Sequence, residues 1–198
     1  MIRRPTGSKG WMVADMDEFW VFGYGSLMWN PGFRFEEKWT ARAFGYRRSL
    51  CVHSWVHRGT ERRPGLVLGL DHGGSCIGTA FRVASAEKAD VLDYLREREL
   101  VTRVYKERTM PVQLADGRRV PALAYVIDRN HVQYAGALTA AEAAATVAVA
   151  VGKSGPNSEY VLNTLGHLRE MGIRDHWLEE VATSLNAGAA ASAQVQIR

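Results

Sequence analysis

The chain has 198 residues, of which 46% are hydrophobic and 23% charged, a composition typical of one soluble globular domain. No apolar run approaches the roughly 20 residues of a membrane-spanning helix, and the basic start of the chain leads into no apolar signal segment, so we expect a cytoplasmic protein. The net charge of +4 could favour nucleic acid, but the basic residues are scattered and accompany no nucleic-acid-binding motif. We interpret them as a solvated surface: Arg42, Arg47, Arg48, Arg62, Arg63, Arg118 and Arg119.

The sequence predicts one central domain between two less ordered chain ends, with strands in its first half. Residues 1–18 are expected to form a flexible arm, residues 19–185 one domain, and residues 186–198 a loosely ordered, alanine-rich tail. Apolar or alternating runs predict strands, with turns at Gly73-Gly74 and Asp116-Gly117. The predicted strands cover residues 20–24, 44–52, 66–70, 77–83, 104–114 and 120–127.

Helices are predicted once within the strands and then to the end of the chain. Ser85 can cap the first, Thr139 and Glu142 form a capping box for the second, and Asp175 can cap the last. A further helix is predicted between the last two, because the spacing of Val161, Leu165 and Leu168 places them on one helix face. Strands followed by helices predict an α+β fold, with a small mixed β-barrel or a curled sheet and flanking helices.

Cysteine and histidine spacing argues against a disulfide or a metal site. Cys51 and Cys76 form no close-spaced motif, so we expect both to be buried and reduced. His53 and His57 fall where a strand runs into a loop, and four strand residues span about 13 Å, too far for both to hold one ion. We therefore expect no metal site.

Three segments could carry chemistry, and each also has a plain structural interpretation. Residues 22–27, Phe-Gly-Tyr-Gly-Ser-Leu, run from a strand into a glycine-rich turn, where glycine permits φ > 0 and close approach of a ligand to backbone N–H groups. Glu97 and Glu99 lie two apart at a helix end, so they face different ways and only one can point inward. Residues 153–160 can simply begin a helix, with Tyr160 packed in its first turn.

Together these segments resemble the ChaC family of γ-glutamylcyclotransferases. The matching pieces are residues 22–29 with Pro31 and Phe33, His57-Arg58-Gly59-Thr60 with Pro64-Gly65, Tyr94-Leu95 with Arg98-Glu99, and residues 155–160. They occur in family order over about residues 20–180. One departure is clear, because many members carry Gly-Gly-Tyr after Arg-Glu, whereas this chain has Leu100-Val101-Thr102.

The resemblance implies a fold, an activity and a set of site residues. It implies a compact fold on a small β-barrel, Glu99 as the catalytic general acid and base, and cyclisation of the γ-glutamyl group of glutathione to 5-oxoproline and Cys-Gly. The implied substrate-binding residues are Tyr24, Gly25, Ser26, Leu27, Arg58 and Tyr160. The implied reaction needs neither a cofactor nor a metal. The expected partner is a small γ-glutamyl peptide, with no nucleic acid or membrane.

Two other functions stay open on the sequence alone. The chain could cyclise other γ-glutamyl amino acids or amines, or it could be a non-catalytic module, since the family was once linked to cation transport. Glu99 beside a complete Tyr24–Leu27 segment favours an enzyme. The sequence leaves open whether that segment holds a substrate carboxylate or the developing oxyanion, and it does not predict the oligomeric state.

Overall fold

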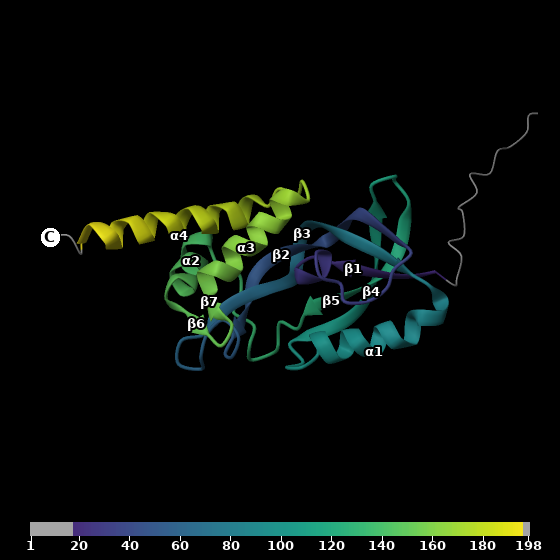
Figure 1. The fold of residues 1–198 in the computed structure, drawn as a ribbon, viewed down its shortest axis with the longest axis horizontal. Helices are drawn as coiled ribbons and strands as arrows, with labels where there is room; N and C mark the ends of the chain where they lie inside the picture. The colour runs from purple at the N-terminus through teal and green to yellow at the C-terminus, as the bar shows by residue number, and fades with distance from the viewer. Residues whose placement is uncertain (1–17, 196–198) are drawn as a thin grey trace, which may run out of the picture.

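The computed structural model describes residues 18–195 and shows a barrel with helices on two sides (Figure 1). The expected flexible arm lies outside the described residues except for Glu18. The strands close into a mixed barrel in the order β1-β3-β2-β4-β5, in which β1 and β5 are parallel and the other pairs antiparallel. Their bounds are β1 Phe19–Gly23, β2 Glu37–Ser54, β3 Gly65–Val83, β4 Tyr105–Leu114 and β5 Arg119–Ile127. This confirms the α+β prediction and, of the two alternatives, selects the closed barrel.

The second and third strands are far longer than predicted because the Gly73-Gly74 signal does not reverse the chain. Both glycines lie inside β3 with φ of 103° and 71°, opposite Gly45 of β2 with φ of 80°. The register shifts there, between Phe44 and Tyr46. The glycines therefore form a bulge that bends two paired strands, so the predicted turn is wrong.

The last two strands form the hairpin that Asp116-Gly117 predicts. Gly117 has φ of 91°, and the pairing runs from Tyr105 opposite Ile127 to Gln113 opposite Arg119. This β4–β5 hairpin joins β2 on one side and β1 on the other, which closes the barrel.

Helices α2, α3 and α4 cover one side of the barrel, and α1 lies on the other (Figure 1). The capping box of Thr139 and Glu142 is present at the start of α2, and Asp175 accepts the N–H of Leu178 at the start of α4 at 3.1 Å. The helices are α1 Lys88–Glu99, α2 Ala140–Val149, α3 Asn157–Glu170 and α4 His176–Val195, with 3-10 turns η1 Ser26–Met28 and η2 Ser85–Glu87 and a short pair β6 Val151–Gly152 and β7 Gly155–Pro156.

Of the three apolar clusters in residues 18–195, the two larger ones pack the helices against the barrel. The larger fills the barrel and continues to α2, α3 and α4, and it includes Trp20 and Phe22 of β1, both fully buried. The smaller lies under α1, where Leu95 packs with Val21 and Leu123 on the outer face of the barrel. Successive residues of β1 thus serve both cores, as the period of a strand requires.

The last helix, α4, continues to Val195, past Asn186, where the predicted tail begins. Alanine has the highest helix propensity of any residue, and the segment after Asn186 is rich in it. Within residues 18–195, no helix is long and apolar enough to cross a membrane.

Candidate active site

A cavity of about 180 Å³ opens where β1 leaves the barrel. It contains six of the seven residues that the sequence singled out, drawn from three segments far apart in the chain. Its lining consists of Tyr24, Gly25, Ser26, Leu27, Val67, Leu68, Glu99, Tyr105, Tyr125 and Tyr160. Glu99 is the one acidic or basic side chain in this lining, so the cavity places a single carboxylate among neutral groups.

The Glu99 carboxylate sits at the last residue of α1, and its side chain is 18% exposed. Burial raises the pKa of this carboxyl above its usual range, and the guanidinium of Arg98, with Nε 3.2 Å from Oε1, acts in the opposite direction. Glu97, two residues earlier, is exposed and absent from the cavity lining. The helix therefore presents one of its two terminal glutamates to the cavity.

The Tyr24–Leu27 segment, which we call the substrate loop after its predicted role, leads from β1 into the turn η1. A Cβ atom on Gly23 would lie 3.0 Å from Cβ of Leu27, so the chain doubles back too tightly for a side chain there. Neither Gly23 nor Gly25 uses the positive φ that glycine permits, and Gly25 has φ of −135°. The loop is thus compact because of close approach and not because of left-handed glycine.

Arg98 braces the substrate loop from α1. Its Nη2 donates to the Ser26 hydroxyl at 2.9 Å, and its Nη1 donates to the Asn30 carbonyl at 2.8 Å and to the Tyr94 hydroxyl at 2.9 Å. Tyr94 in turn packs so closely on Gly32, with φ of 75°, that a Cβ atom there would collide with its ring. The residue next to Glu99 therefore ties the end of α1 to the loop across the cavity.

Two tyrosine hydroxyls bind the edge of β3 at Leu68. Tyr160 at the start of α3 accepts the Leu68 N–H at 3.1 Å, and Tyr105 donates to the Leu68 carbonyl at 2.6 Å. This part of β3 lies beyond its pairing with β1, so side chains take the place of a neighbouring strand. Burial raises the pKa of Tyr160 to about 12 and raises that of Tyr105, so both hydroxyls stay protonated at neutral pH.

Tyr105 and Tyr125 are cavity residues that the sequence analysis missed. The only signal was that each falls within a predicted strand, and a strand pattern does not say which of its residues will reach the edge of another strand. Tyr125 donates to Glu107 at 3.1 Å on the α1 side of the barrel, and burial raises its pKa.

Arg58 is the predicted site residue that does not line the cavity. Its guanidinium donates to the carbonyls of Ser154 and Pro156 and lies over the Tyr160 ring, 5.5 Å from the centroid. Arg58 therefore contacts a cavity residue and supports it from outside. Among residues 18–195 no group of three histidine, cysteine or carboxylate side chains is placed to hold a metal ion.

Comparison with known proteins places the chain in a family. The sequence model of the family described as ChaC-like protein matches residues 19–187. The chain belongs to the ChaC-like family. A member from Escherichia coli, named glutathione-specific γ-glutamylcyclotransferase, is 34% identical over 171 residues, which cover 86% of this chain and 74% of that protein.

Other relatives extend the likeness. The glutathione-specific γ-glutamylcyclotransferase 1 of Rattus norvegicus is 31% identical over 189 residues, covering 92% of this ChaC-like chain and 85% of the rat protein. The crystal structure of a γ-glutamylcyclotransferase from yeast, described as specific to glutathione, has the same fold, with a TM-score of 0.76 over 86% of this chain and 96% of the yeast chain at 23% identity.

Proposed function

We propose that this chain cleaves glutathione by cyclising its γ-glutamyl group, releasing 5-oxoproline and Cys-Gly, with Glu99 as the general acid and base. The names of the family's curated relatives support the substrate and reaction. The observation that carries the assignment to this site is the Glu99 carboxylate, which is mostly buried and has a raised pKa, at the wall of a cavity that the substrate loop also lines.

The reaction needs a proton acceptor and a proton donor. The α-amine of the substrate attacks its own γ-carbonyl carbon, a C–N bond closes the five-membered ring, and the original amide C–N bond breaks. An ammonium group cannot attack, so a base must first remove a proton, and the departing amine must gain one. Glu99 can do both in turn, and because the reaction is intramolecular, orientation supplies much of the rate.

The surroundings of Glu99 suit this role. A carboxyl whose pKa burial raises is a better proton acceptor than an exposed one. The neighbouring Arg98 keeps the carboxylate from being stranded as an unpaired buried charge. A substrate ammonium that enters the cavity then meets Glu99 as its only carboxylate there.

The neutral groups of the cavity orient the substrate. Backbone N–H groups around Gly25 and Ser26 can hold the substrate α-carboxylate or the developing oxyanion, and the tyrosine hydroxyls add further hydrogen bonds. At about 180 Å³ the cavity is smaller than a typical site for a whole ligand. We therefore propose that it encloses the γ-glutamyl group and leaves the rest of the peptide at its mouth, beside the Leu100–Thr102 segment.

The other interpretations differ in what they require of this site. A cyclase for γ-glutamyl amino acids needs the same base and differs only in what lies outside the cavity. A non-catalytic module needs no buried carboxylate, and the burial of Glu99 favours an enzyme. We also place the protein in the cytoplasm, since both cysteines are free and buried, as suits a reducing compartment.

Product analysis tests the proposal. Purified protein is incubated with glutathione, γ-glutamyl-alanine or oxidised glutathione, and 5-oxoproline is measured by mass spectrometry. We expect 5-oxoproline and equimolar Cys-Gly from glutathione, a lower kcat/KM with γ-glutamyl-alanine, and little product from the bulkier oxidised form. Equal or higher kcat/KM with γ-glutamyl-alanine would favour a cyclase for other γ-glutamyl amino acids. No 5-oxoproline from any substrate would contradict the proposal.

A further inference from the structure

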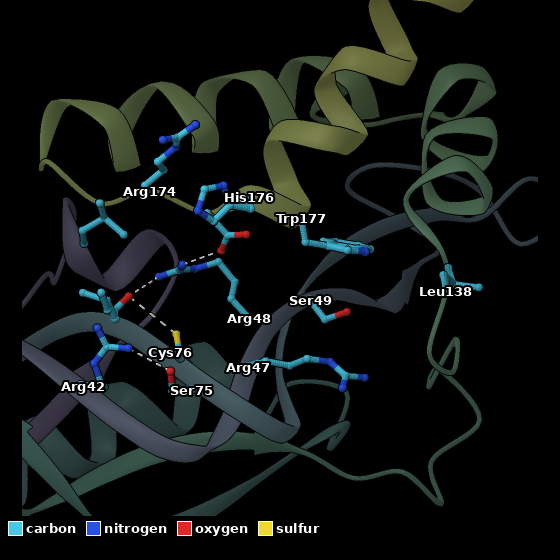
Figure 2. Close-up of a pocket in the computed structure, with 13 residues that line it drawn as sticks. Arg42, Arg47, Arg48, Ser49, Ser75, Cys76, Leu138, Arg174, His176 and Trp177 are labelled. Atoms are coloured by element: carbon cyan, nitrogen blue, oxygen red, sulfur yellow. Dashed lines mark hydrogen bonds and ion pairs between the residues drawn. The ribbon is translucent and has the colours of Figure 1, made fainter.

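A second cleft, larger than the candidate active site, lies between the barrel and the start of α4. It has a volume of about 480 Å³ and shares no lining residue with the cavity around Glu99. One wall comes from β2 and β3, and the other from the segment that joins α3 to α4 and from the start of α4 (Figure 2). Arg42, Arg47 and Arg48 come from the first wall, and Arg174 and His176 from the second.

The floor of the cleft is a buried ion pair that is already complete. The Arg48 side chain is 4% exposed, and its Nη1 donates to Asp175 at 2.8 Å. Its Nε and Nη2 donate to the carbonyls of Tyr24 and Ile77, at 2.6 and 2.7 Å. The hydrogen bonds of Arg48 are thus made within the protein. Asp175, the one carboxylate in the lining, pairs with Arg48 and not with the outer arginines, by which we mean Arg42, Arg47 and Arg174.

The outer arginines keep much of their binding capacity. Arg42 donates to the neutral hydroxyl of Ser75, and no carboxylate within residues 18–195 forms an ion pair with it. Arg47 is 3.3 Å from Asp71, which Arg129 approaches more closely, at 2.7 Å. Arg174 is 73% exposed and lies 3.3 Å from Glu179. Each guanidinium therefore has donors to offer to a ligand.

We propose that this cleft binds a small, multiply charged anion with carboxylate or phosphate groups. Arginine side chains contribute to both walls of the cleft, which favours a ligand with more than one negative charge. Planar guanidinium is the side chain best suited to carboxylate and phosphate groups. The Ser49 and Ser75 hydroxyls add neutral donors, and Trp177 adds an apolar surface at one end. The site does not depend on the proposed reaction, because it uses none of the residues around Glu99.

Titration calorimetry at fixed ionic strength tests the site, with pyrophosphate, ATP and citrate as probes that separate phosphate from carboxylate ligands. We expect saturable binding of one equivalent of at least one probe, and at least about tenfold weaker binding to the Arg42→Ala/Arg174→Ala variant. Both residues are exposed, and an unchanged melting temperature checks that the variant is folded. Arg34→Ala/Arg119→Ala removes the same charge from exposed positions elsewhere and should bind normally.

Three results would overturn the proposal. These are no saturable binding of any probe, equal weakening in the matched charge-loss control, and binding that Glu99→Gln abolishes but Arg42→Ala/Arg174→Ala does not. The last would put the anion in the other cavity. Because binding is measured without turnover, a chain that forms no 5-oxoproline but binds the anion would fail the proposed function and keep this site.

Discussion

Arg48 is expected to be the most important single side chain for holding the substrate loop to the helical layer. Arg48→Met fills similar space but removes the donors to the carbonyls of Tyr24 and Ile77 and the partner of Asp175. A buried polar group left unpaired costs about 1–3 kcal/mol, and removing one partner of a buried ion pair costs about 3–5 kcal/mol. Since the Asp175 side chain is 13% exposed and can be partly solvated, we expect a total loss of about 4 kcal/mol.

The neighbouring Arg47→Met is the matched control. Arg47 is 43% exposed, so water screens its interaction, and Asp71 would keep Arg129 and Tyr134 as partners. We expect its loss of stability to stay within about 1 kcal/mol. Urea unfolding at neutral pH measures both variants, and kcat/KM well below the melting temperature reports whether the loop has moved, since a misplacement of about 1 Å can cost about 100-fold. Equal midpoints for the two variants would refute the reasoning.

Three further predictions follow from other contacts. Asn157→Ala should destabilise the fold by about 2–4 kcal/mol in urea, because the buried amide bonds both the N–H and the carbonyl of Leu66, whereas the exposed Asn163→Ala should cost under about 0.5 kcal/mol. Burial raises the pKa of Glu99, so the folded protein disfavours the ionised form of this carboxyl. The free energy of unfolding therefore loses the contribution of Glu99 as the pH rises from the usual glutamate pKa through the raised value in the fold. Glu99→Gln should therefore be at least as stable as the parent at pH 7 and lose that advantage in acid, and an equal difference at both pH values would contradict the assigned cause. Finally, 5-oxoproline formation should be unchanged after dialysis against EDTA. A loss of activity that only a divalent ion restores would contradict the metal-free mechanism.

Local sequence signals predicted the parts of the fold that local contacts determine. Asp116-Gly117 gave a hairpin and Thr139 with Glu142 gave a capping box, because both features need only neighbours in sequence. Gly73-Gly74 carries a turn signal of the same kind, yet β2 pairs across it over the full length of β3. Because β2 and β3 pair on both sides of these glycines, the glycines form a bulge and not a turn.

Burial at the two candidate sites depended on contacts that no local pattern contains. Arg47 and Arg48 are adjacent and were both interpreted as solvated surface, but the Arg48 side chain is 4% exposed because the substrate loop and Asp175 close over it, so that interpretation is wrong for Arg48. Tyr105 likewise reaches β3 only because the barrel closes. The choice of Glu99 over Glu97 rested on the resemblance to the ChaC family, since helical periodicity alone left both open.

The most direct test of the central claim is kcat with glutathione for Glu99→Gln and Glu97→Gln, measured side by side with thermal melting. Glu99→Gln keeps the size of the side chain but removes the base, so we expect kcat to fall by about 10² to 10⁴, or roughly 3–5 kcal/mol of barrier, with the fold and substrate binding retained. Glu97→Gln should behave like the parent, because that side chain is exposed and outside the cavity. An inactive Glu97→Gln with an active Glu99→Gln, or full activity in both, would contradict the assignment of Glu99 as the general acid and base.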